Sequence, residues 1–177
     1  GRADLVLVDG RTFAISDDAG QIVGGTHGLV CDDRRYLSRF VARVADADIE
    51  VLAAESVTPF SAVVVARVRD PGEGTAVLTR RLWVAGGLRE DLHLHNTSSR
   101  PQQWFLRLEV AADFAHVFDV KQGLAALPGT WQPHGDGWRI TAPDGSATVE
   151  VRTDPAPTRS VDGSLEWELT VESRTEE

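Results

Sequence analysis

The sequence lacks methionine altogether and contains one cysteine, Cys31, among its 177 residues. A single cysteine forms no internal disulfide and no cysteine-rich metal site, which is typical of a reducing compartment. Long apolar runs are missing too, because the longest one, Ala62 to Ala66, is far short of the roughly 20 residues that cross a bilayer. The N-terminus has no basic-then-apolar signal pattern. We therefore expect a cytoplasmic protein, and the missing initiator methionine indicates part of a longer chain.

Lysine is nearly absent, since seventeen of the eighteen cations are arginine, and the 27 acidic residues leave a formal net charge of -9. A surface of this charge repels phosphate backbones and anionic lipids, so we expect neither nucleic acid nor a membrane as a partner. Apolar residues make up 42% of the chain and charged residues 25%, as in ordinary globular proteins. We predict that residues 1–177 form a single domain.

Alternation of apolar and polar residues is the strongest pattern that is present. Several segments place every second apolar side chain on one face, or are rich in β-branched and aromatic residues: Tyr36 to Val44, Phe60 to Val68, Thr75 to Val84, Gln103 to Ala111 and Leu165 to Val171. Asp-Gly pairs such as Asp144-Gly145 mark tight turns between them. About a dozen short strands predict an all-β fold, and we favour a two-sheet antiparallel β-sandwich.

Helical spacing occurs in one short segment, Asp113 to Val120. Phe114, Val117 and Phe118 lie at positions i, i+3 and i+4, behind Asp113 as the predicted N-cap. We expect at most one or two short helical turns, and we expect the three apolar side chains to pack over the sandwich.

Acidic pairs give little indication of catalysis. A glycoside hydrolase needs two carboxyl groups about 5 to 9.5 Å apart. Glu90 and Asp91 are neighbours on a strand, so their side chains point to opposite faces. Glu166 and Glu168 share a face at a spacing of about 7 Å, but they alternate with core residues as solvated side chains do. We predict no catalytic residue in this chain.

His93 and His95 also share one strand face, a spacing that suits two ligands of a zinc ion. The possible third ligands are His27, His116 and His134. Arg89 lies on the same face, and a cation beside a divalent metal is unfavourable. Neither a dinucleotide-binding fingerprint nor a P-loop is present. We predict no metal and no cofactor.

Five tryptophans are the other candidates for binding, because indole rings stack on the apolar faces of sugars. Trp104 and Trp167 alternate with apolar residues and are predicted to lie in the core. Trp131, in a Pro/Gly-rich connection, Trp138, at the start of a strand, and Trp83, at the end of one, are candidate sugar contacts. For these three, plain packing remains the competing interpretation.

Three ordered motifs resemble those of a known family. Thr26 to Arg39 is similar to a segment near the start of bacterial glycogen debranching proteins of the amylo-alpha-1,6-glucosidase type. Arg80 to Asn96, which includes Gly86-Gly87-Leu88-Arg89-Glu90, and Ala112 to Val120 resemble two later motifs of the same proteins. Arg34 stands where threonine is usual, and His116 where aspartate is usual. The likeness covers residues 4 to 171.

This resemblance implies an N-terminal β-supersandwich domain that precedes an (α/α) barrel, and the barrel hydrolyses α-1,6-linked glucose at branch points. The barrel is not in this chain, so no catalytic residue is transferred to it. Asp33 and Arg35 are expected to form an ion pair that pins a loop. The segment from Asp33 through Tyr36 to Ser38 is a candidate interface with the barrel, with structural pinning as the alternative.

The leading hypothesis is therefore a non-catalytic accessory domain of a glycogen-debranching-type glycoside hydrolase. It would act as a scaffold for the barrel and help to position α-glucan. Two alternatives stay open. One is a stand-alone carbohydrate-binding module, and the other is a structural or self-association domain that forms a homo-oligomer through an apolar patch.

Overall fold

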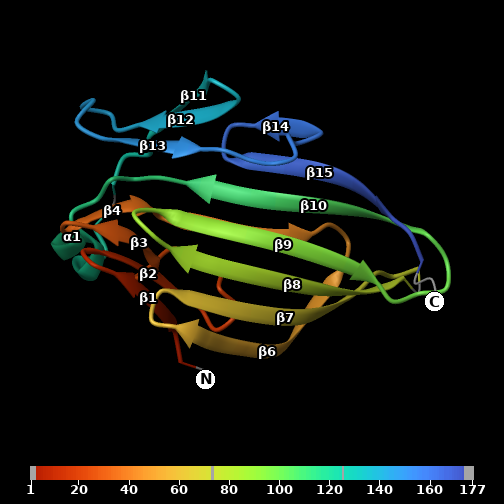
Figure 1. Cartoon of the computed structure of the whole chain (residues 1–177). Helices are drawn as coiled ribbons and strands as arrows, with labels where there is room; N and C mark the ends of the chain where they lie inside the picture. Colours follow the sequence, from red (N-terminus) through yellow and green to blue (C-terminus); the bar gives the residue numbers. More distant parts are fainter. Residues whose placement is uncertain (1–2, 73, 125, 174–177) are drawn as a thin grey trace.

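The computed structural model describes residues 3–72, 74–124 and 126–173 (Figure 1), so both ends of the predicted domain 1–177 lie outside the described residues. The described part contains fifteen strands and one short helix, which confirms the all-β class. The strands are β1 Leu5–Asp9, β2 Thr12–Ser16, β3 Gly28–Cys31, β4 Arg34–Leu37, β5 Arg39–Val44, β6 Asp48–Thr58, β7 Ser61–Arg69, β8 Thr75–Val84, β9 Leu88–Asn96, β10 Gln102–Ala111, β11 Thr130–His134, β12 Gly137–Thr141, β13 Thr148–Val151, β14 Arg159–Val161 and β15 Ser164–Val171.

Hydrogen bonds join these strands into four small antiparallel sheets. Strands β1 to β4 form one sheet, β6 to β9 a second and β11 to β13 a third, each in chain order. The fourth sheet has the order β14-β15-β10-β5, so it brings together strands that are far apart in the sequence. Figure 1 shows the β6–β9 sheet across the front, β11–β13 at the top, and β1–β4 beside the helix at the left.

The arrangement differs from the two-sheet sandwich that we expected. The four sheets surround a common core like the blades of a four-bladed ring. One reason lies at Ser38, where the predicted strand Tyr36 to Val44 is divided. β4 ends at Leu37 and pairs with β3, whereas β5 begins at Arg39 and pairs with β10. A break of one residue therefore sends the chain from one sheet to another.

Two clusters of buried side chains hold the sheets together. The larger cluster takes residues from all four sheets, including Leu7, Leu82, Leu108 and Ile140, each at most 7% exposed. The smaller cluster lies between the β6–β9 sheet and the β14-β15-β10-β5 sheet, which pack face to face there as in a sandwich. Its buried members are Val44, Val68, Ala76, Leu78, Trp104 and Leu106.

A buried ion pair interrupts the apolar inner face of the β6–β9 sheet. Arg80 in β8 binds Glu90 in β9, and both side chains are 3% exposed. The same guanidinium donates to the backbone carbonyls of Ala19 at 2.7 Å and Gly20 at 3.3 Å. Glu90 pairs with the buried Leu82 on the apolar side of β9, and its contact with Arg80 explains why a charge is tolerated there.

The helix, α1 Val117–Gln122, begins later than predicted. Its N-cap is His116 and not Asp113, because His116 Nδ1 accepts a hydrogen bond from the Phe118 backbone N–H at 3.2 Å. Phe114 is buried, but Phe118 is 62% exposed and stacks on His116, so only part of the predicted packing occurs. Within the described ranges, no helix is long and apolar enough to cross a membrane.

Candidate functional site

Arg35 joins two segments that are far apart in the sequence and that both belong to the motifs described above. Its guanidinium makes a bidentate ion pair with Asp113, which follows β10. It also donates to the backbone carbonyls of Gly25 at 2.7 Å and His27 at 3.1 Å. The Arg35 side chain is 10% exposed and that of Asp113 is 14% exposed. Paired, buried charges of this kind fix the relative position of three chain segments.

Gly28 makes room for this arginine. It is the first residue of β3 and lies on the same outer face of the sheet as Arg35, one strand away. A Cβ atom at Gly28 would lie 2.4 Å from Arg35 Cδ, 2.8 Å from Cγ and 2.9 Å from the Leu37 carbonyl oxygen. Because the guanidinium is already held at its far end, the arginine cannot easily move aside. The close approach therefore requires glycine.

Backbone hydrogen bonds fasten the same two segments to each other. The pairs are Arg35 N–H to Ala115 O at 2.8 Å, Ser38 N–H to Ala111 O at 2.9 Å, and Val117 N–H to Asp33 O at 2.8 Å. The Tyr36 ring meets the Phe114 ring edge to face, with 5.9 Å between the ring centroids. The four residues for which we predicted interface or pinning contacts thus all touch the segment from Ala111, at the end of β10, to Val117, at the start of α1.

The predicted ion pair between Asp33 and Arg35 is wrong. Asp33 follows Asp32 in the turn between β3 and β4, where both have positive φ, and it is exposed. Arg35 instead extends across Gly28 and reaches Asp113, 78 positions along the chain. Sequence proximity suggested the nearer carboxylate, whereas strand pairing brings the distant one into range.

The outer face of β1 and β2 is apolar, although outer faces of antiparallel sheets are usually polar. Val6 pairs with Ile15 and Val8 with Phe13 across the two strands. Val6 is 50% exposed and Val8 is 42% exposed. The core-facing residues of β2 are Thr12, Ala14 and Ser16. They are smaller and more polar than the outward-facing Phe13 and Ile15. We call Val6, Val8, Phe13 and Ile15 the β1–β2 apolar face. Its signal in the sequence was the apolar run on both faces of β1 together with the large apolar residues at alternate positions of β2.

The three candidate tryptophans lie in two different places. Trp131 in β11 and Trp138 in β12 share the face of their sheet that carries the buried Ile140, and both pack partly buried against the larger core cluster. Trp83 lies on the outer face of the β6–β9 sheet, where it pairs with Ser61 in β7 and with Arg89 in β9. The Arg89 guanidinium carbon is 5.5 Å from the centroid of the Trp83 ring. The three rings therefore do not form one surface.

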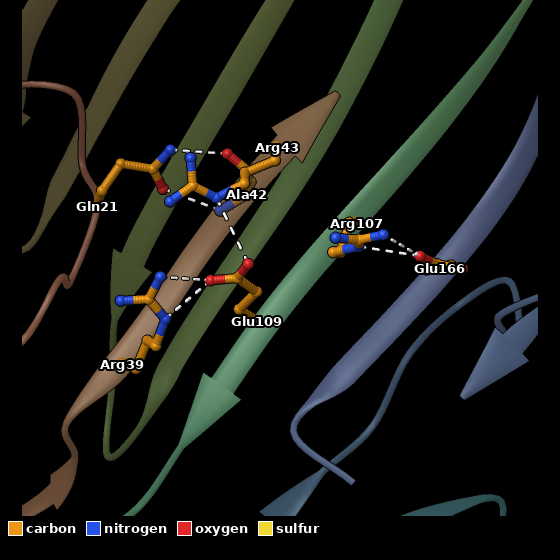
Figure 2. A network of polar contacts seen from close by, with 7 residues as sticks. All are labelled: Gln21, Arg39, Ala42, Arg43, Arg107, Glu109 and Glu166. Carbon is orange, nitrogen blue, oxygen red and sulfur yellow. Dashed lines mark hydrogen bonds and ion pairs between the residues drawn. The ribbon is translucent and has the colours of Figure 1, made fainter. Parts of the chain in front are cut away.

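Two glutamates on the outer face of the β14-β15-β10-β5 sheet, Glu109 and Glu166, are paired with arginines (Figure 2). Arg39 and Arg43 approach Glu109 from two sides, and Arg107 binds Glu166. Burial of the carboxylate favours a higher pKa for Glu109, but the hydrogen bond from Arg39 and the charges of the nearby arginines outweigh it, so its pKa is lowered. A general acid needs a shift in the opposite direction.

The remaining acidic residues and histidines that we considered for catalysis or metal binding either bond to other side chains or do not form a large enough group. Glu168 accepts a hydrogen bond from the Gln103 side chain, so neither Glu166 nor Glu168 is an unpaired carboxylate. His93 and His95 share the outer face of β9, as predicted. Among the residues that the structure describes, they join no group of three or more metal-binding side chains.

These observations define an all-β domain whose buried polar contacts hold its strands and loops in place, with apolar and polar surfaces left open. Comparison with protein families identifies a matching one, described as the N-terminal domain of (some) glycogen debranching enzymes, over residues 7–177. The chain belongs to this family. A comparison with curated proteins gave no match.

Proposed function

We propose that this chain is a non-catalytic accessory domain of a glycogen-debranching-type glycoside hydrolase. Its role is to dock against an (α/α) catalytic barrel in the same parent chain and to help position α-glucan. The family match over residues 7–177 is the observation that supports this function most strongly. The ion pair of Arg35 with Asp113, which we call the arginine clamp, supports it too, because both residues lie in motifs that resemble this family and the pair fixes the shape of the domain.

The β1–β2 apolar face is the surface that we propose for docking the barrel. It carries two half-exposed valines and two partly buried large side chains. The outer face of an antiparallel sheet, which contacts water, normally carries polar residues instead. It adjoins the Gly28 and Arg35 positions on the same sheet, because Ile15 pairs with Gly28 and Phe13 with Val30. Buried at the core of an interface with the barrel, such a face would meet apolar side chains of the partner, as interface cores usually do.

The test compares the proposed parent chain with a version that lacks residues 1–177. We expect the truncated barrel to unfold at a lower temperature and to lose turnover on branched dextrin, whereas the isolated domain releases no glucose from it. In the full chain, Val6→Asp with Val8→Asp should lower the unfolding temperature of the barrel, because burying a carboxylate in an apolar interface is costly. Val161→Asp is the matched control, since Val161 is 66% exposed on β14.

Two results would contradict the proposal. Glucose release by the pure isolated chain would show catalysis where we assign none. If the truncated barrel were as stable and as active as the full chain, the accessory role would be ruled out. The location in the cytoplasm, expected from cysteine usage, stays a prediction that fractionation of cells would test.

A further inference from the structure

Strand β6 forms one edge of the β6–β9 sheet, and this edge is open (Figure 1). Within the described residues, β6 pairs with β7 alone, and no backbone hydrogen bond reaches it from the other side. It is also the longest described strand, with 11 residues, and all of them except Val51 and Thr58 are exposed. An open edge presents a row of N–H and C=O groups to which another strand can bind.

Several other sheet edges are bonded to a further segment of the chain itself. The backbone pairs are Arg35 with Ala115 at the edge of β4, Phe40 with Ile22 at that of β5, and Val8 with Pro59 at that of β1. Proteins also protect edge strands with lysine, proline or bulges. β6 contains neither lysine nor proline, and its first bulge lies at Leu52. Residues 48–51 therefore form a regular and unprotected stretch of edge.

This stretch of edge is acidic. Between Val44 and Ala66 the chain contains no basic residue and four acidic ones, namely Asp46, Asp48, Glu50 and Glu55. Asp48 and Glu50 lie on the outer face of the sheet, because Ile49 between them pairs with the fully buried Val68. Glu50 contacts Arg67 through one carboxylate oxygen at 3.5 Å, and Asp48 has no ion pair in the part of the chain that the structure describes. Both carboxylates can therefore bind a further cation.

The neighbouring strand β7 shows which side chains suit residues 48–51. It places Arg69 opposite Asp48, Val68 opposite Ile49, and Arg67 opposite Glu50. A strand added at the free edge would meet the same side chains on the same faces, because side chains of neighbouring strands point to the same side of a sheet. A second copy of β6 would bring only acidic and uncharged residues to this edge. The charges therefore favour a basic strand over self-association.

We propose that residues 48–51 of β6 bind an extended basic segment of another polypeptide, which adds a strand to the β6–β9 sheet. The segment carries arginine or lysine at alternate positions, next to Asp48 and Glu50. An apolar residue between them covers Ile49, which is 37% exposed. In this mode of recognition, main-chain hydrogen bonds supply affinity and the alternate side chains supply specificity. The β1–β2 apolar face belongs to another sheet, so this inference does not depend on docking of the barrel.

The experiment titrates the chain at low salt with a peptide that copies residues 64–69 of β7 and is blocked at both ends. We expect backbone amide shifts and slower hydrogen exchange centred on residues 48–51. Two control peptides should not bind. One has glutamate in place of both arginines, and the other has methyl groups on alternate amide nitrogens, which prevents strand pairing but keeps the side chains.

A charge reversal on the protein tests the role of the acids. Glu50→Lys should weaken binding of the basic peptide about three- to tenfold, because it replaces attraction by repulsion at an exposed site. The matched control is Glu172→Lys, which changes an exposed acid beyond the end of β15 and should bind as the wild type does. Both positions are exposed, so we expect both variants to fold.

Each other outcome overturns the inference. No shifts at millimolar peptide, equal binding of either control peptide, or equal weakening by Glu172→Lys would each do so. Shifts centred on β8 would mean that the peptide displaces β7 and does not add to the edge. Sedimentation of the chain alone as a dimer, with the β6 amides protected from exchange before any peptide is added, would assign the edge to a second copy.

Discussion

At the scale of single residues, the clamp around Arg35 depends on the missing side chain of Gly28. Gly28→Ala places a Cβ atom 2.4 Å from Arg35 Cδ, and the guanidinium is anchored by Asp113 and two carbonyls. We expect a loss of stability of about 1 to 3 kcal/mol, the usual cost of overpacking. For a chain of this size, this loss corresponds to a fall in Tm of roughly 2 to 12 °C, which calorimetry would measure.

Gly87→Ala is the matched control for this variant. Gly87 has no atom within 4 Å of a built Cβ and no positive φ, so alanine fits there without strain. We expect a change within about 0.5 kcal/mol. Equal losses at both positions would show that the close contact with Arg35 is not what requires glycine.

A second prediction at this scale concerns pH. The pKa of Glu109 is lowered in the folded protein, chiefly because the hydrogen bond from Arg39 and the nearby arginine charges overcome the effect of burial. The stability that this carboxylate contributes is therefore fully present above its unfolded pKa, about 4.3, and is lost as pH falls through the lower folded value. The stability difference between wild type and Glu109→Gln should shrink as pH falls below about 4.3.

Urea unfolding between pH 7 and pH 3 would measure this difference. An NMR titration adds a direct check, because Arg39→Gln should move the pKa of Glu109 upward toward the usual range of a glutamate. An unchanged titration of Glu109 in Arg39→Gln would contradict the role assigned to the hydrogen bond from Arg39.

At the scale of elements, the segment between β10 and α1 contains two phenylalanines with opposite environments. Phe114 is 9% exposed, belongs to the larger core cluster and contacts Tyr36, whereas Phe118 is 62% exposed on α1. Phe114→Ala should cost about 3 to 5 kcal/mol, and Phe118→Ala about 0.5 kcal/mol or less in the isolated chain. Chemical denaturation would measure both. A larger loss at Phe118 would mean that α1 packs more tightly than its exposure indicates.

Elements were predictable where local pattern alone decides them. The bounds of β8, Thr75–Val84, match the predicted segment, and Asp144-Gly145 does connect β12 and β13, because alternation and turn chemistry are read within a few residues. The helix start and the break at Ser38 were missed. Both depend on distant partners: Asp113 is occupied by Arg35, and Ser38 donates its N–H to Ala111.

At the scale of the whole molecule, the grouping of strands into sheets could not be predicted from local sequence patterns, because it too depends on partners that are distant in the sequence. β5 and β10 pair although Val44 and Leu106 are 62 positions apart. The sequence of either strand alone does not indicate which strand it pairs with. The resemblance brought the right motifs together, yet it did not indicate that Arg35 would reach Asp113. The β1–β2 apolar face was readable in principle from Phe13 and Ile15, but alternation alone assigns apolar residues to the inside.

Whether residues 1–177 act as one domain depends on how the two core clusters are joined. Leu92 and Trp167 pack against both clusters, so loss of one cluster removes contacts from the other. We expect a single cooperative transition. Labelling with 5-fluorotryptophan allows a test without disruptive substitutions, because Trp104 reports on the smaller cluster and Trp138 on the larger one. Their native ¹⁹F signals should disappear at the same urea concentration, whereas separate midpoints would divide the chain into two folding units.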